Sequence, residues 1–148
     1  MNRYSPTQPV ELLLVEDDQG DIDLTRESLE ENKISVNLNV VRDGVSAMQY
    51  LFKQGPYSDA TRPDLIILDL NLPKKDGREV LHDIKNDGDI KYIPIVVLTT
   101  SESEADILKT YDLGANCYVT KPIGLEKFVK IVQTIEEFWF TVVKLPSR

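Results

Sequence analysis

The sequence predicts an α/β fold in which five parallel strands form a doubly wound sheet with helices on both faces. Short apolar runs alternate along the 148 residues with amphipathic segments that repeat every three or four positions. The runs stay apolar throughout, which is typical of strands buried on both faces. A segment of helical length follows each run, as crossovers between parallel strands require.

The predicted strands are short and rich in leucine, isoleucine and valine. They cover residues 11–15, 36–41, 65–68, 95–98 and 117–120. The predicted helices carry charged residues with apolar ones at helical spacing, as where Val80, Leu81 and Ile84 face inward. They cover residues 22–31, 45–52, 77–86 and 103–113, with a long last helix from about residue 125.

Length and composition predict a single domain. With 41% hydrophobic residues and no stretch rich in glycine, serine or proline, the chain can form one well-buried core and is too short for two. Residues 1–9 lack periodic apolar positions and are predicted to be a flexible arm. The domain is therefore expected to span residues 10–148, including an aromatic C-terminal extension.

Charge and cysteine content exclude several classes of partner. The formal net charge of −8 argues against direct nucleic-acid binding. The single cysteine, Cys117, rules out an internal disulfide and a thiolate metal cluster. No stretch reaches the roughly 17 to 25 apolar residues of a membrane helix, and the N-terminus does not resemble a signal peptide. We expect a cytoplasmic protein that binds proteins or small ligands.

Polar side chains follow four of the five predicted strands, at the point where each strand ends. Ligands in open α/β sheets bind outside the carboxyl ends of the strands, so these side chains are expected to form one site. The groups are Glu16, Asp17 and Asp18 after the first strand, Asp69 and Asn71 after the third, Thr99 to Ser101 after the fourth, and Lys121 after the fifth.

The chemistry of this set indicates metal-assisted phosphoryl transfer. Clustered carboxylates raise one another's pKa unless a cation neutralises them, and hard oxygen ligands suit Mg2+. Asp69 is then placed as a nucleophile toward a phosphoryl donor, and Lys121 supplies a second positive charge. The Thr99 hydroxyl can donate to the arriving phosphoryl oxygen.

Each residue also has a plainer interpretation. Asp18 or Asp21 could cap a helix, Asp69 could be a turn residue, and Lys121 could be a solvated loop residue. Tyr118 is more often packing than a switch. Four separate strand ends carry polar groups that converge on one edge of the sheet. The plainer roles would have to produce this convergence by coincidence, so the functional interpretation is favoured.

These motifs resemble the receiver domains of two-component response regulators. The resemblance spans about residues 12–132 through LLLVEDD, LIILDLNLPKKDG, IPIVVLTTS and YVTKP, in the expected order. It implies a flavodoxin-like (βα)5 fold and a phosphoacceptor that is not an enzyme acting on external substrates. The residues 56–63 and the aromatic tail look like the single-domain regulators that serve cyanobacterial phytochrome kinases.

For the metal site, the resemblance implies phosphorylation of Asp69 by a sensor histidine kinase in the presence of Mg2+. Asp17 and Asp69 would bind the ion directly, Glu16 mainly through water, and Asn71 through its backbone carbonyl. The acidic pair is Glu-Asp where the family usually has Asp-Asp. Asp18 is a further acid whose role the family pattern leaves open.

For the switch, the resemblance implies that Thr99 and Tyr118 respond together to phosphorylation. Lys121 would bind the phosphoryl group, and the peptide bond before Pro122 would be cis, a rare feature of X-Pro bonds. No DNA-binding or catalytic domain follows the last predicted helix, so signalling through protein contact is expected.

Two other functions stay open at this point. A phosphohydrolase with an aspartate nucleophile would need a second aspartate two residues on, where this chain has Asn71. A flavodoxin-like binding module would need a glycine-rich phosphate loop after the first strand, where only Gly20 is present. Turnover of phosphate esters and flavin absorbance would identify these alternatives.

The last helix carries more apolar residues than one face can hold. Residues 125, 128, 132, 135, 139 and 142 form one stripe, but Phe138 and Phe140 lie elsewhere on a helix of about twenty residues. One possibility is that the helix stops near Glu137 and the aromatic segment folds back as an extended flap. We favour a two-fold homodimer whose interface includes Phe138, Trp139 and Phe140.

Overall fold

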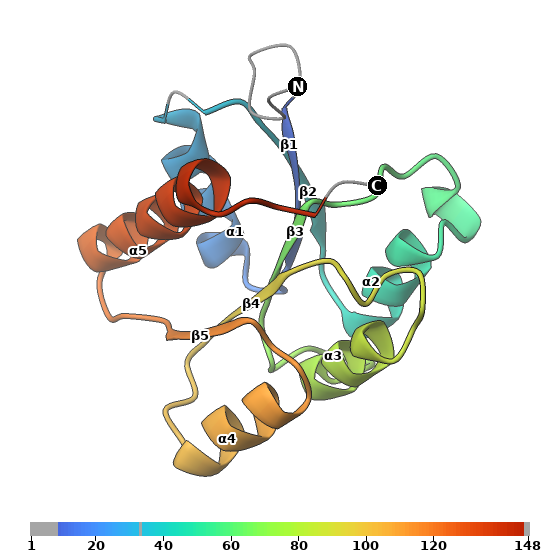
Figure 1. Cartoon of the computed structure of the whole chain (residues 1–148). Helices are drawn as coiled ribbons and strands as arrows, with labels where there is room; N and C mark the ends of the chain where they lie inside the picture. The colour runs from blue at the N-terminus through green and yellow to red at the C-terminus, as the bar shows by residue number, and fades with distance from the viewer. Residues whose placement is uncertain (1–8, 33, 147–148) are drawn as a thin grey trace.

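The computed structural model describes residues 9–32 and 34–146, and Figure 1 shows their arrangement. The flexible arm predicted for residues 1–9 lies outside the described residues, except for Pro9. Five parallel strands form one sheet in the order β2-β1-β3-β4-β5. This is the doubly wound order of flavodoxin-like folds, so the predicted fold class is confirmed. The strands are β1 (Val10–Val15), β2 (Val36–Val41), β3 (Leu65–Leu68), β4 (Ile95–Thr99) and β5 (Cys117–Thr120).

The register of the strands brings their carboxyl ends to one edge of the sheet. Val15, the last residue of β1, pairs with Val41 of β2 and with Leu68 of β3. The Asp69 N–H continues this pairing and donates to the Val15 carbonyl at 3.0 Å. The polar residues that follow β1 and β3 are consequently neighbours.

Helices cross over between the strands, and polar side chains cap the first four. Asp18, Asp43, Asp76 and Ser103 each accept a backbone N–H from the first turn of the helix that follows. The predicted bounds hold to within three residues, and the first helix begins earlier than predicted because Asp18 caps it. The helices are α1 (Gln19–Glu30), α2 (Gly44–Leu51), α3 (Gly77–Lys85), α4 (Glu104–Asp112) and α5 (Leu125–Glu137), with a short 3-10 turn at Gly55–Tyr57.

The sheet separates two hydrophobic cores. On one face, β1, β3 and β4 pack against α1 and α5 through residues such as Leu14, Ile22 and Phe128. On the other face they pack against α2 and α3 through residues such as Val15 and Leu81. No helix among the described residues combines the length and apolar character needed to cross a membrane.

Beside β5, α4 buries little of its surface. At this outer edge of the sheet, the Tyr118 N–H donates to the Tyr111 hydroxyl of α4 at 3.1 Å.

The chain after α5 confirms the predicted extension of the last helix and contradicts the extended flap. The α-helix ends at Glu137 and continues directly as a π-helical turn, Phe138–Val142, so the helical segment runs from Leu125 to Val142. The wider turn changes which way its side chains face. It buries Phe140 to 1% exposure in the same hydrophobic core as Phe128, within a single chain. Assigning Phe140 to a dimer interface was therefore wrong. Trp139 packs partly against the same core, and Phe138 is 50% exposed.

A buried carboxylate lies where α5 packs on α1. Glu136 is 1% exposed, and its Oε1 accepts a hydrogen bond from Asn32 Nδ2 at 2.6 Å. Its Oε2 has no hydrogen-bond partner among the described residues. Burial raises the pKa of Glu136 from its ordinary 4.5 to about 7. The folded protein therefore holds this proton more tightly than the unfolded chain does.

We expect Glu136→Gln to weaken the pH dependence of stability. The stability that the protonated Glu136 provides is complete below about pH 4.5 and is lost as the pH rises through about 7. From pH 5 to pH 8 the free energy of unfolding should fall by on the order of 2 kcal/mol more in the wild type than in the variant. Denaturant titrations at both pH values measure this difference.

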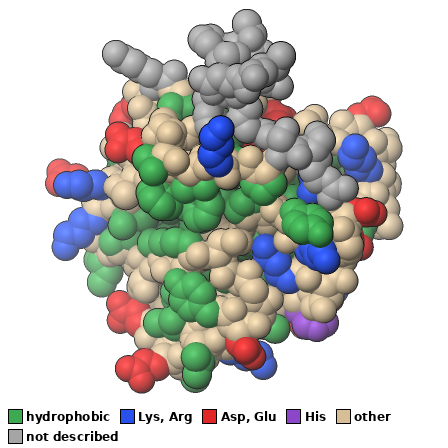
Figure 2. Space-filling view, in the orientation of Figure 1, with side chains coloured by type: hydrophobic (Ala, Val, Ile, Leu, Met, Phe, Trp, Pro, Cys, Tyr) green, Lys and Arg blue, Asp and Glu red, His purple; other side chains and the backbone are tan. Residues whose placement is uncertain are grey.

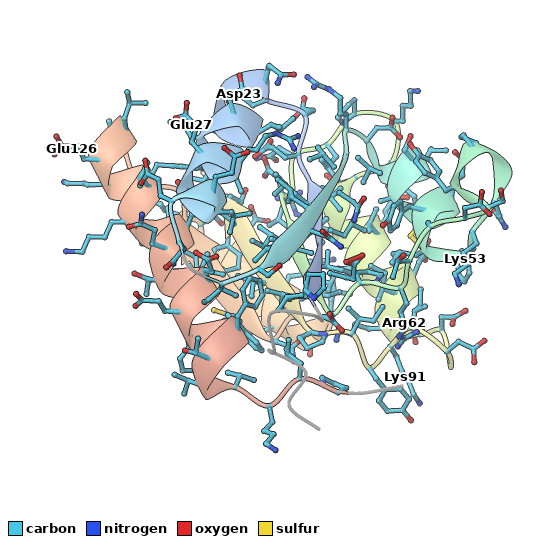
Figure 3. All side chains as sticks on the ribbon, turned by 90° about the horizontal axis from the view of Figure 1, so that it is seen from above. Asp23, Glu27, Lys53, Arg62, Lys91 and Glu126 are labelled. Carbon is cyan, nitrogen blue, oxygen red and sulfur yellow. The ribbon has the colours of Figure 1, made fainter. Side chains whose placement is uncertain are left out.

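A matched control is Glu126→Gln, which removes an exposed carboxylate at the other end of α5 (Figure 3). This control should follow the wild type at both pH values. A Glu136→Gln variant that also followed the wild type would show that Glu136 titrates at its ordinary pKa in the folded protein.

Candidate functional site

The acidic residues predicted after β1 and β3 form one cluster. Glu16, Asp17 and Asp69 each place a carboxylate oxygen so that these oxygens lie within 4.8 Å of one another. Glu16 is 3% exposed and Asp69 7% exposed, whereas Asp17 faces solvent. The cluster follows from the strand register, because β1 and β3 are adjacent and end at the same level. It is open to solvent on the side of Asp17.

Glu16 holds the loop that follows β1. Its Oε2 accepts the backbone N–H of Asp17 at 3.0 Å and that of Asp18 at 3.2 Å. Its Oε1 lies 2.5 Å from the Lys121 ammonium. Burial is the main cause that raises the pKa of Glu16 to about 7, and the contact with Lys121 opposes it. Asp18 caps α1 through the Asp21 N–H, which gives this further acid a structural role.

Lys121 extends from the end of β5 into the cluster, where its side chain is 7% exposed. Its Nζ lies 3.0 Å from Asp69 Oδ2 and 2.8 Å from Asp21 Oδ2, in addition to Glu16. Although burial lowers the pKa of Lys121, its three carboxylate partners raise it above the ordinary value. The ammonium group therefore stays charged.

Asp21 is the one contact of Lys121 that the sequence interpretation missed as a site residue. It lies in the first turn of α1, where the sequence alone suggests only a role in capping the helix. The available signal was a fourth acid within six residues, Glu16 to Asp21, just past the end of a buried strand.

The loop after β3 fixes the orientation of Asp69. Its Oδ1 accepts the Asn71 N–H at 3.2 Å, while its Oδ2 faces Lys121. Farther along, the Gly77 N–H donates to the Leu70 carbonyl at 2.9 Å and closes the loop over the strand end. That the Asn71 carbonyl binds a metal ion stays a prediction.

Thr99 ends β4, and Tyr118 of β5 reaches the loop that follows Thr99. Thr99 is fully buried, and its Oγ1 has no hydrogen-bond partner among the described residues. The Tyr118 hydroxyl donates to the Ser101 carbonyl at 2.9 Å, two residues after Thr99. The Lys121 N–H donates to the Thr99 carbonyl at 2.7 Å and joins the two strand ends. A buried hydroxyl without a partner is costly, so Thr99 fits an acceptor that arrives during function.

The prediction of a cis bond before Pro122 was wrong, because the described residues contain no cis peptide bond. A trans X-Pro bond is favoured intrinsically by about 0.5 to 1 kcal/mol. With the trans bond, the Lys121 ammonium already lies within 3.0 Å of Asp69 Oδ2. The position of the ammonium group therefore does not require the cis form.

The donor set of this cluster fits a divalent cation. Every candidate ligand is a carboxylate oxygen, and two of the three residues are buried. Such groups repel one another unless a positive charge lies between them, and Lys121 alone supplies one charge. Hard oxygen donors with solvent access on one side are the surroundings that Mg2+ and Mn2+ prefer.

On a sheet of order 2-1-3-4-5, a buried aspartate faces a charged lysine beside a cluster of carboxylates. This arrangement is the one expected of a phosphoacceptor domain. The chain belongs to the family of response regulator receiver domains, whose model matches residues 12–133. This agrees with the resemblance in its motifs and supports this function over the phosphohydrolase and the flavin-binding module.

Relatives of known structure share both the fold and the length of this chain. Response regulator Rcp1 of Synechocystis is 51% identical over 94% of this chain and 95% of its own length. The crystal structure of the Mn(2+)-bound form of Rcp1 has a TM-score of 0.91. The match covers 94% of this chain and 100% of the Rcp1 chain. The phosphorylated cyanobacterial phytochrome response regulator RcpA is 52% identical, with a TM-score of 0.91 over 94% of this chain and 99% of RcpA. The bacteriophytochrome response regulator RtBRR is 40% identical, with a TM-score of 0.73 over 94% of this chain and 85% of RtBRR.

Proposed function

We propose that Asp69 of this response regulator accepts a phosphoryl group from a sensor histidine kinase. The observation that carries this proposal is the position of Asp69, whose Oδ1 is held by the Asn71 N–H and whose Oδ2 lies 3.0 Å from the Lys121 ammonium. Asp69 is also the buried acid of the cluster that comes from the central strand β3.

In the transfer, an Asp69 carboxylate oxygen attacks the phosphorus of a phosphohistidine. The new P–O bond makes an acyl phosphate, the P–N bond breaks, and the leaving imidazole keeps the electron pair and takes up a proton. Lys121 stabilises the negative charge on the phosphoryl oxygens, and it is already charged and in place before the donor arrives. The chain catalyses only its own phosphorylation and dephosphorylation, so it acts as a signalling protein.

Mg2+ is the cofactor that we propose for this step. Glu16, Asp17 and Asp69 would hold it with the Asn71 carbonyl, and Glu16 would act mainly through water because Lys121 occupies its Oε1. When bound, the ion supplies positive charge toward the phosphoryl oxygens. The Mn(2+)-bound form of Rcp1 supports a divalent ion in this family.

Thr99 and Tyr118 form the proposed switch. The unpartnered Thr99 hydroxyl would donate to a phosphoryl oxygen, and the loop after β4 would move with it. Because the Tyr118 hydroxyl is bonded to Ser101 in that loop, a change at Thr99 reaches the exposed side of β5. The signal is then passed on by contact with another protein.

The proposed phosphoryl donor is a phytochrome kinase in the cytoplasm. RcpA is a phytochrome response regulator and RtBRR a bacteriophytochrome response regulator, which supports this choice. The acidic net charge of −8 supports protein partners over nucleic acid. We propose that residues 10–148 act together as one receiver domain.

Incubation with acetyl phosphate and Mg2+, followed by intact mass measurement, tests the phosphoacceptor function. The wild type should gain one phosphoryl group, and chelation of the metal should prevent it. Steady release of phosphate from aryl phosphate esters would instead indicate a phosphohydrolase. Failure to gain mass with acetyl phosphate and with a phytochrome kinase would refute the proposal.

We further propose that the protein forms a two-fold homodimer through the face made by α4, β5 and the end of α5. Figure 2 shows hydrophobic side chains gathered on the side where Figure 1 presents these elements. Exposed apolar residues on these elements support an interface. They are Leu108 and Tyr111 of α4, Leu125 at the start of α5, and Phe138 and Val142 after its end, which line a hollow with Asn32 and Ile34.

A Phe138→Glu, Val142→Glu variant should sediment as a monomer at concentrations where the wild type is a dimer. Both side chains are at least half exposed in the single chain, so the exchange should leave the fold intact. The matched control is Phe52→Glu, which places a charge on the exposed end of α2, away from this face. A wild type that is monomeric at micromolar concentration, or a double variant that still dimerises, would refute the interface.

A further inference from the structure

Lys121 has one partner that does not belong to the metal cluster. Of the three carboxylates that it contacts, Glu16 and Asp69 are members of the cluster within 4.8 Å, and Asp21 is not. The contact with Asp21 is a direct bond of 2.8 Å between charged groups. Such bonds are about twice as strong as those between neutral groups.

When a metal ion and a phosphoryl group occupy the site, Glu16 and Asp69 are less available to bind Lys121. A cation would bind carboxylate oxygens of the cluster, and phosphorylation of Asp69 turns the attacking oxygen into the uncharged bridging oxygen of an acyl phosphate. Lys121 has three ammonium protons, which now point to three acids. Of its present partners, only Asp21 keeps a full carboxylate outside the cluster throughout the reaction.

The backbone of Asp21 is fixed by two hydrogen bonds. Its N–H donates to Asp18 Oδ2 at 3.0 Å, and its carbonyl accepts from Thr25 Oγ1 at 2.7 Å in the first turns of α1. Its side chain is 25% exposed, and Glu16 and Asp69 still face Lys121, so an uncharged replacement does not leave the buried ammonium group unpaired. It is therefore a fixed anchor on the α1 side of the ammonium group.

We infer that Asp21 is a positioning residue, whose carboxylate holds the Lys121 ammonium in place while metal and phosphoryl group occupy Glu16 and Asp69. This inference rests on the proposed phosphoacceptor role of Asp69. It assigns to α1 a part in binding the phosphoryl group, through Lys121 and without contact to the group itself.

An opposite effect has to be weighed, because the negative charge of Asp21 also repels a phosphoryl dianion. Loss of the carboxylate removes this repulsion, but the Asp21 side chain is 25% exposed, so solvent already screens its charge at the phosphoryl group. The same loss releases the flexible four-carbon side chain of Lys121. We therefore expect the loss of anchoring to outweigh the loss of repulsion, so that removal of the Asp21 charge weakens binding of the phosphoryl group.

The test uses beryllofluoride, a probe that takes the place of the phosphoryl group on an aspartate, with Mg2+ present. Asp21→Asn should weaken its binding about tenfold, the loss expected for one hydrogen bond to a charged group. The affinity for Mg2+ alone, measured separately, should change much less, because Asp21 is not in the metal cluster. Asp21→Glu, which keeps the charge and reaches farther, should restore most of the affinity.

The matched control is Asp23→Asn, which removes the same charge from the same helix. Asp23 points away from the site at the surface of α1 (Figure 3) and contacts Gln19. NMR signals of the Lys121 ammonium protons supply a readout of position. In Asp21→Asn they should exchange faster with water than in the wild type or in Asp23→Asn.

Equal or tighter beryllofluoride binding by Asp21→Asn would overturn the inference, since repulsion would then outweigh anchoring. So would an Asp21→Glu variant that binds as weakly as Asp21→Asn. A wild type that binds Mg2+ but neither beryllofluoride nor a phosphoryl group would instead refute the proposed function, and the inference with it.

Discussion

Asp69→Asn should take up no measurable phosphoryl group from acetyl phosphate. The amide keeps the shape of the side chain and can still contact the Asn71 N–H, but it lacks the charge that makes the oxygen a nucleophile. Loss of a nucleophile commonly lowers the rate more than about a thousandfold. Intact mass as a function of time measures the effect directly.

Two further exchanges make this result specific. Asp17→Asn should still be phosphorylated, but only at higher Mg2+ concentration, because one cluster oxygen has lost its charge. Asp59→Asn removes an exposed carboxylate from the loop before β3 and should behave as wild type. Phosphorylation of Asp69→Asn at the wild-type rate would show that another residue is the acceptor.

Gly77→Ala should destabilise the protein by about 3 kcal/mol, the upper range for forcing extra atoms into a packed interior. Gly77 is the first residue of α3, where alanine would ordinarily favour the helix. A Cβ here would lie 2.3 Å from the Asp69 carbonyl oxygen and 2.6 Å from Leu70 Cα, both in the backbone. The strand end that carries Asp69 would have to move, so phosphorylation should fall as well.

Gly88→Ala is the control, because a Cβ at this exposed glycine meets nothing within 4 Å. It should leave stability unchanged or raise it slightly by restricting the unfolded chain. Denaturant unfolding of the wild type, Gly77→Ala and Gly88→Ala compares their free energies of unfolding. Equal stability of Gly77→Ala and Gly88→Ala would show that α3 does not approach the Asp69 backbone this closely.

Strand ends could be predicted from the sequence because a parallel sheet buried on both faces leaves few alternatives. Once the runs before Glu16, Asp69 and Thr99 are strands, their carboxyl ends must meet at one edge. The same logic placed Lys121 beside Asp69, although the two are 52 residues apart in sequence. These residues lie where the topology alone predicts them.

Contacts that depend on side-chain direction could not be predicted in this way. Asp21 reaches Lys121 because α1 begins at Gln19, which depends on the cap at Asp18 and shifts every helical position with it. The burial of Phe140 depends on a π-helical turn, which has no periodic signature in the sequence. The bond before Pro122 was assigned from the family resemblance, and the chain departs from that expectation.

The hydrogen bond from the Tyr118 N–H to the Tyr111 hydroxyl has a consequence for solubility. Edge strands with unpaired N–H groups can recruit further strands and start fibrous aggregation. At Tyr118 a side chain of the same molecule occupies this donor, so another chain cannot use it to extend the sheet. The contact with α4 therefore protects part of the β5 edge against extension of the sheet by another chain.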